Sequence, residues 1–99
     1  MSRRTERAQR LYNEYNSYID AMEPHVDAAD AFRESGRRFK AASEETKAWR
    51  LFYEADRVIG KADRLMYREY KRSQNWRAMN EHRERLLYGA RGVSDASRV

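Results

Sequence analysis

Apolar residues recur every three or four positions through the first 40 residues of the chain. A flanking stripe adds Tyr12, Ile19 and Val26, so that each heptad carries about three apolar residues. This spacing predicts an amphipathic helix over about 4–40, wide enough for a globular bundle rather than a two-stranded coiled coil. Gly36 lies within the register, so we interpret it as a point of close helix packing and not as a turn. The main stripe consists of Ala8, Leu11, Tyr15, Tyr18, Met22, His25, Ala29, Phe32, Gly36 and Phe39.

A second helix is expected after a short segment of small and acidic residues. Ser43 is a suitable N-cap, and Glu44 and Glu45 would place negative charge in the first helical turn, where the helix dipole favours it. The same apolar spacing then continues to about residue 88. These features predict a turn at about 41–43 and a helix over about 44–88.

The apolar stripe of this second helix slips by one position after Met66. The slip indicates either a stutter in one long helix or a third helix capped by Ser73. Residues 71–75 contain neither Gly nor Pro, so we favour near-continuity through them. Gly89 and Gly92 are expected to end the helix.

Pro24 is the only proline in the chain, and it lies inside the first predicted helix. Proline removes a backbone donor and clashes with the carbonyl four residues earlier. The heptad phase passes through Pro24 without a slip, so we expect a kink near 20–24 and not a chain reversal. If the chain did break here, Asp20 or Glu23 would cap a new helix and the fold would be a three- or four-helix bundle.

Charges along the two predicted helices favour an antiparallel pairing. With a turn centred near residue 42, four opposite-sign pairs fall in one register, and Asp30 against Glu54 is the exception. Exposed pairs contribute only ~0.2–1 kcal/mol each, so they select the register more than they stabilise the fold. We therefore predict an all-α fold, a long antiparallel helical hairpin that completes a helical bundle by self-association or with a partner. The four pairs are Asp20–Arg64, Glu23–Lys61, Asp27–Arg57 and Glu34–Arg50.

Composition places the chain in the class of small helical domains. Its 99 residues predict a single helical domain over 1–92 with a short tail over 93–99. Twelve aromatic residues argue against disorder, and the lack of cysteine excludes disulfides and thiolate metal sites. No apolar run approaches the roughly 20 residues that span a bilayer, and the charged N-terminus leads into no signal-like segment. We expect a cytoplasmic protein, or one in the host cytoplasm or virion if it is phage-encoded.

The net charge of +5 is unevenly distributed. Residues 1–10 carry +3 and residues 64–91 carry +5, and an antiparallel hairpin would bring both to the end away from the turn. Such a basic end could contact anions or nucleic acid, although a solvated charged face is the plainer interpretation. The candidate contacts are Arg3, Arg4, Arg7, Arg10, Arg64, Arg68, Lys71, Arg72 and Arg77.

Four aromatic residues fall outside the main stripe and are candidate protein-interface residues: Trp49, Tyr53, Tyr67 and Tyr88. Tyr, Trp and Arg are enriched at binding hot spots. We therefore predict a non-enzymatic protein–protein interaction module (an adaptor, assembly component or inhibitor) whose partner is another protein or a second copy. No cofactor, metal, membrane or small-molecule substrate is expected. Nucleic-acid binding through the basic end is the alternative.

Catalytic motifs are nearly absent. His25 falls on the apolar stripe, where a core histidine with a satisfied ring nitrogen is the usual occupant. The segment from Arg77 to His82 resembles the Arg-x4-His pattern of the helical ribonucleases known as HEPN domains, which implies RNA cleavage by these two residues as a remote alternative. Ala78 departs from the polar residue that commonly follows the Arg in that family. We therefore predict that the protein is not an enzyme.

Overall fold

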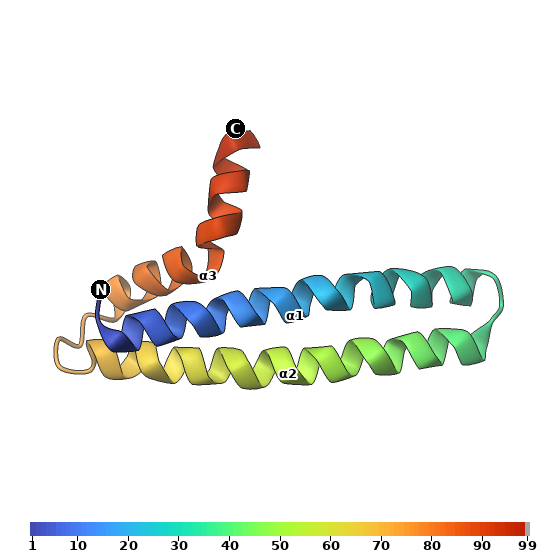
Figure 1. The fold of residues 1–99 in the computed structure, drawn as a ribbon, viewed down its shortest axis with the longest axis horizontal. Coiled ribbons are helices and arrows are strands. Elements are labelled where there is room, and N and C mark those ends of the chain that lie inside the picture. Colours follow the sequence, from blue (N-terminus) through green and yellow to red (C-terminus); the bar gives the residue numbers. More distant parts are fainter. Residues whose placement is uncertain (99) are drawn as a thin grey trace. The chain divides into compact units, whose positions relative to one another are not determined.

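The computed structural model describes the backbone of residues 1–98 and the side chains of residues 1–89. Within this part of the chain there are three helices, α1 (Arg3–Glu34), α2 (Arg38–Tyr70) and α3 (Trp76–Arg98) (Figure 1). Helices α1 and α2 pack against each other as an antiparallel hairpin, so the predicted all-α hairpin is confirmed. Helix α3 continues past Gly89 and Gly92, where we expected the helix to end.

The chain forms two compact units. Unit 1 consists of Met1–Asn13 and Ile59–Val99, and therefore contains the start of α1, the end of α2 and α3. Unit 2 consists of Glu14–Val58, and contains the rest of α1, the turn and the first part of α2. The division into a helical domain over 1–92 and a tail over 93–99 stays a prediction.

The turn of the hairpin lies at residues 35–37, earlier than the expected 41–43. The amide of Gly36 donates to the carbonyl of Arg33 (3.1 Å) and the amide of Arg37 donates to the carbonyl of Phe32 (2.7 Å). Gly36 has a φ of 77°, the left-handed conformation that glycine adopts without strain. Together these features form a Schellman motif that ends α1. Our interpretation of Gly36 as a packing residue was therefore wrong, and Ser43 lies inside α2 instead of capping it.

The earlier turn changes the register between α1 and α2. The cross-helix pairs include Arg4–Glu69, His25–Glu44 and Arg33–Glu45, which belong to a register centred on the turn at 35–37 and not on residue 42. Arg57 forms an ion pair with Glu54 of its own helix. Its guanidinium donates to Glu54 at 2.8 Å, and this hydrogen bond raises the pKa of Arg57. The register that predicted the pairs Asp20–Arg64, Glu23–Lys61, Asp27–Arg57 and Glu34–Arg50 is therefore wrong.

Helices α2 and α3 are separated by residues 71–75, so the favoured near-continuity is wrong and the predicted alternative of a separate third helix is correct. Gln74 adopts a φ of 52°, which turns the chain without a glycine. Asn75, not Ser73, is the N-cap of α3, because its side-chain oxygen accepts the amide hydrogen of Ala78 at 3.1 Å. Ser73 instead donates to the carbonyl of Tyr70 at the end of α2.

Helix α1 continues through Pro24, so the alternative in which the chain reverses at this residue is wrong. Neither Asp20 nor Glu23 caps a helix, because both lie inside α1. The kink that we expected near 20–24 stays a prediction.

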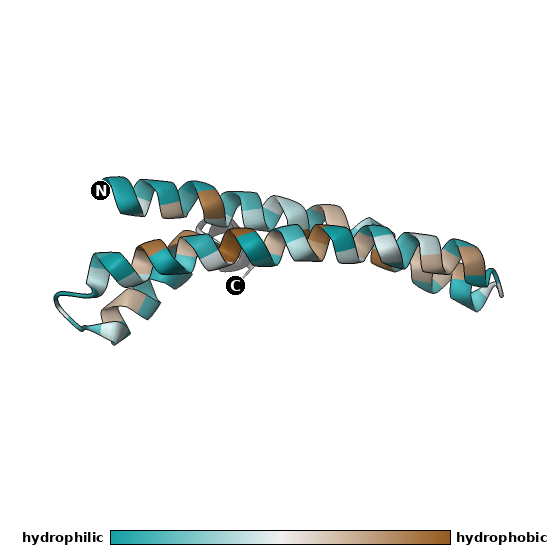
Figure 2. Ribbon diagram, turned by 90° about the horizontal axis from the view of Figure 1, so that it is seen from below, coloured by the Kyte–Doolittle hydropathy of each residue, from teal (hydrophilic) through white to brown (hydrophobic). Residues whose placement is uncertain are grey.

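The apolar cores of the two units differ in the size of their side chains. Unit 1 buries Tyr12, Met66, Leu86 and Leu87 together with small residues, whereas the buried hydrophobic residues of unit 2 are Ala29, Ala41, Ala48, Ala55 and Val58. Figure 2 shows strongly hydrophobic positions as isolated bands on otherwise hydrophilic helices. Small side chains let the helices of unit 2 approach closely but cover little apolar surface.

Candidate functional site

An open apolar groove runs along unit 2 between α1 and α2, with a volume of about 480 Å³. On α1 its lining residues span positions 22–33, which corresponds to about 16 Å of helix. We call it the hairpin groove. It is lined by Met22, Val26, Ala29, Asp30, Arg33, Glu45, Ala48, Trp49 and Phe52.

The groove exists because small residues form its floor and large ones its sides. Ala29 and Ala48 are buried, while the side chains of Val26, Phe52 and Trp49 remain 40%, 41% and 56% exposed. Packed protein interiors leave few spaces of this kind unfilled. The apolar stripe is thus too broad for two helices to cover in unit 2, as the sequence indicated.

Charged residues close one end of the groove. Arg33 forms ion pairs with Asp30 of its own helix and with Glu45 of α2. Nearby, Nδ1 of His25 shares a hydrogen bond of 2.6 Å with Oε2 of Glu44, so a ring nitrogen is satisfied as expected. The side chain is 34% exposed, however, so His25 is not the core residue that we predicted. The bond with His25, followed by one from Lys47, lowers the pKa of the Glu44 carboxyl group. These bonds tie α1 to α2 beside the groove.

Two of the four predicted interface residues lie at this site. Trp49 lines the groove, and its ring lies 6.0 Å from that of Tyr53, which is 66% exposed. Tyr67 and Tyr88 are exposed but belong to unit 1, where Tyr67 stacks on Trp76 at 5.3 Å. The structure therefore brings Trp49 and Tyr53 together and places the other two in a different unit.

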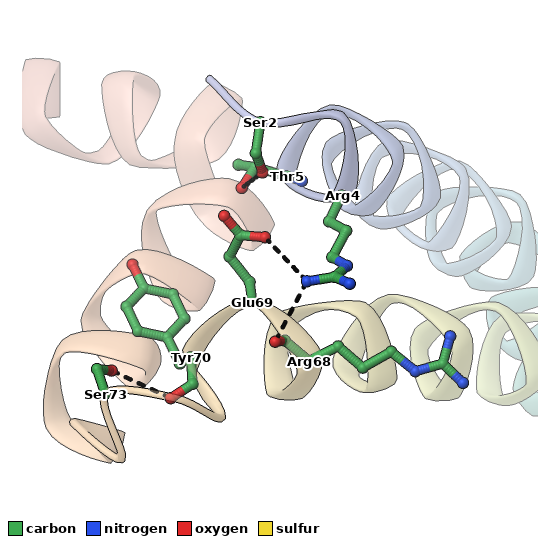
Figure 3. Close-up of polar contacts among 7 residues, drawn as sticks. All are labelled: Ser2, Arg4, Thr5, Arg68, Glu69, Tyr70 and Ser73. Carbon is green, nitrogen blue, oxygen red and sulfur yellow. Dashed lines mark hydrogen bonds and ion pairs between the residues drawn. The ribbon is translucent and has the colours of Figure 1, made fainter.

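All nine predicted anion-contact residues lie in unit 1 and are exposed. The unit carries fourteen Lys and Arg and six Asp and Glu, a net charge of +8, whereas unit 2 carries seven and ten, a net charge of −3. Figure 3 shows Arg4 reaching from α1 to α2, where it contacts the carboxylate of Glu69 at 3.9 Å and the carbonyl of Arg68 at 3.4 Å. The same view shows Ser2, which caps α1 by accepting the amide hydrogen of Thr5.

A polar cluster in unit 1 was not predicted. Tyr12 on α1 donates to Asp63 on α2 at 2.6 Å, and Arg83 on α3 donates to the same carboxylate at 2.6 and 3.3 Å. Burial, and then the bond to Asp63, raises the pKa of Tyr12. Gln9 adds a hydrogen bond of 2.9 Å to the carbonyl of Leu86. These bonds fasten α3 to the other two helices.

The residues of the ribonuclease-like pattern take part in structural contacts. His82 shares a hydrogen bond of 2.7 Å with the hydroxyl of Tyr70, and Arg77 forms an ion pair with Glu81. Among the described residues, no group of three or more His, Asp or Glu side chains could hold a metal ion. Within the same part of the chain, no helix is both long and apolar enough to cross a membrane.

No family model matches the chain, and neither the curated proteins nor the solved structures include a match. The assignment of function therefore depends on the hairpin groove and the basic surface of unit 1.

Proposed function

We propose that this protein is a non-enzymatic helical interaction module that binds a helix of another protein in the hairpin groove. The observation that carries the proposal is an apolar groove left open along two packed helices. An amphipathic helix laid into such a groove is a recurrent mode of protein recognition. The docked helix would supply the third helical segment that unit 2 lacks.

Energetics support this use of the groove. Full burial of a large apolar side chain stabilises by about 1.5–3 kcal/mol relative to full exposure. Val26, Trp49 and Phe52 are already partly buried, so a partner gains only a fraction of this amount at each. The three side chains lie close together, however, and clustered apolar anchors of this kind dominate the affinity of many interfaces.

A site-specific photocrosslinker tests the proposal in the cell. We expect a crosslinker at Tyr53 to give a protein adduct of defined mass, because this side chain lies at the edge of the groove and is exposed. The same crosslinker at Ala31, an exposed position that does not line the groove, is the matched control and should give no such adduct. Phe52→Glu should abolish the Tyr53 adduct. A monomer in light scattering that gives no adduct from Tyr53 would contradict the proposal.

Nucleic-acid binding is the second candidate, favoured by the concentration of exposed Lys and Arg residues in unit 1. The stacked pair Tyr67–Trp76 lies in the same unit and offers aromatic faces for bases. Binding of this kind weakens steeply with salt, because phosphate contacts release counterions.

Charge reversal tests the second candidate. Changing Arg68, Arg72 and Arg77 to Glu should weaken binding to single-stranded RNA and DNA at least tenfold in a filter or anisotropy assay. A matched control changes three exposed basic residues of unit 2 to Glu and should have little effect on nucleic-acid binding: Arg37, Arg38 and Lys40. Equal binding by both triple variants would exclude a specific role for the basic surface of unit 1.

A further inference from the structure

An acidic stripe follows the α1 side of the hairpin groove. Four exposed acidic residues of α1 each come directly after a residue that lines the groove, and one of them, Asp30, also lines it. They are Glu23, Asp27, Asp30 and Glu34. Their spacing of four, three and four residues places them along one face of α1, one helical position outward from the apolar lining. The groove therefore has an acidic rim on one side.

The opposite side of the groove carries aromatic rings and little positive charge. Trp49 and Tyr53 form this edge, and the α2 residue that adds charge to the lining is Glu45. The basic residue in the groove lining is Arg33, and its guanidinium is already paired with Asp30 and Glu45. The rim and lining together hold five carboxylates and one guanidinium, which favours a positively charged occupant.

A second copy of the chain fits this surface poorly. Its unit 2 carries a net charge of −3 and would bring an equally acidic groove to the interface. Its basic amphipathic helix α3 is already occupied, because Leu86 and Leu87 are buried in unit 1. Groove-to-groove pairing of two copies is therefore disfavoured by charge, and we take a different protein as the partner.

We propose that the hairpin groove binds an amphipathic partner helix that has an apolar face and Lys or Arg residues along one flank. The inference rests on the proposed function and specifies the chemistry of the partner. Apolar side chains spaced by three or four residues would pack over the alanine floor between α1 and α2. The basic flank would lie along Glu23, Asp27 and Glu34, and about three turns of helix would fill the groove.

Peptide titrations followed by Trp49 fluorescence test the inference. The Trp76→Phe background makes Trp49 the sole tryptophan, and circular dichroism checks that each variant remains helical. The probes are designed peptides of about 18 residues, or five helical turns. The first has a Leu/Ala face with Lys and Arg flanks, the second has the same face with Glu flanks, and the third has the composition of the first in an order that is not amphipathic.

We expect the basic amphipathic peptide to bind at least tenfold more tightly than the acidic one at low salt, and the scrambled peptide not to saturate. Changing Glu23 and Glu34 to Gln and Asp27 to Asn should bring the basic and acidic peptides to similar affinity, because the groove remains while only Asp30 and Glu45 keep their negative charge, and both pair with Arg33. Phe52→Glu should abolish binding of both peptides, because it places a charge inside the groove.

Three outcomes would overturn the inference. The first is an acidic peptide that binds as tightly as the basic one, and the second is a triple variant that keeps the full preference. The third is a chain that dimerises with the Tyr53 crosslink formed between copies. If the peptides fail but Tyr53 still crosslinks to a cellular protein, the proposed function stands and the partner chemistry is wrong. If both fail, the proposed function fails as well.

Discussion

Both units bury small residues between α1 and α2, but they differ in whether a third helix covers the remaining apolar surface. In unit 1, Ala8 and Ala62 are fully buried in a core that also holds Leu86 and Leu87 of α3. In unit 2, Ala29 and Ala48 are buried at the floor of a groove whose sides, Val26 and Phe52, remain partly exposed. The difference is the presence of a third helical segment and not the pattern of the hairpin itself.

The two units therefore differ in how much of their apolar surface a third helix covers. In unit 1 a third helix, held by hydrogen bonds of Tyr12 and Arg83 to Asp63, buries Leu86 and Leu87. Without such a helix, unit 2 keeps partly exposed apolar side chains along the hairpin groove, where we propose that a partner binds. Regions with few buried large side chains are also those that open most readily, so unit 2 should be the less protected unit in hydrogen exchange.

The largest expected effect comes from truncating matched apolar residues of α2 in the two units. Met66→Ala should destabilise the protein by about 2–4 kcal/mol, because Met66 is only 1% exposed and its removal leaves a cavity. Phe52→Ala should cost about 1 kcal/mol or less, because that ring is already 41% exposed. Urea denaturation measures both changes. Equal losses would show that the groove side chains contribute to a core as complete as that of unit 1.

At alkaline pH the free energy of unfolding should fall, and the group responsible is the hydroxyl of Tyr12. Because folding raises the pKa of its hydroxyl, the unfolded chain loses this proton first, and stability should fall by up to about 1.4 kcal/mol per pH unit above about pH 10. Below that pH the contribution is fully present. Denaturation curves at about pH 9, 10 and 11, which bracket the ordinary pKa of a tyrosine hydroxyl, measure the change in the free energy of unfolding with pH. Tyr12→Phe should flatten it, whereas Tyr53→Phe at an exposed ring should not.

Removing one carboxylate from each unit sharpens the comparison further. Asp63→Ala should cost about 1–2 kcal/mol, because it leaves Tyr12 and Arg83 without their shared acceptor, although partial exposure moderates the loss. Glu54→Ala should cost less than about 0.5 kcal/mol, because its pair with Arg57 is solvent-exposed. Thermal melts of both variants decide the order, and a larger loss from Glu54→Ala would refute the structural role of the unit 1 cluster.

Substitutions at two glycines should have small effects of opposite sign. Gly36→Ala should destabilise by about 1 kcal/mol, because an L-residue is strained at a φ of 77°. Gly60→Ala should stabilise by about 0.5–1 kcal/mol, because Gly60 is helical and an added Cβ meets nothing within 4 Å. Chemical denaturation resolves both. Loss of stability at Gly60 would mean that the space beside it is filled in solution.

Helical period was enough to predict the hairpin, because both long helices carry a regular apolar stripe. The position of the turn could not be obtained in the same way, since Gly36 falls in phase with the stripe on either side of it. Ser43, Glu44 and Glu45 also imitate a helix start while lying inside α2. Phe39, placed in the apolar stripe, is instead 94% exposed because α2 has only just begun at that point.

The candidate site was only partly predictable for a related reason. Exposure of Trp49 and Tyr53 follows from their position outside the stripe, and the structure shows both exposed. The groove depends on which parts of the hairpin a third helix covers, and that required knowing that α2 ends at Tyr70. The contact between Asp63 and Arg83 likewise crosses the loop at 71–75, where we expected a continuous helix.

Because unit 1 consists of two segments separated by unit 2, the two units become complete at different times during synthesis. The first segment of unit 1, Met1–Asn13, leaves the ribosome before any of the residues from Ile59 onward that complete the same core. Residues 1–13 can therefore pair with the later segment of unit 1 only after the whole of unit 2 has been synthesised, whereas Glu14–Val58 is one contiguous segment. During translation, the segment that carries the hairpin groove is therefore complete before the two segments of unit 1 can meet.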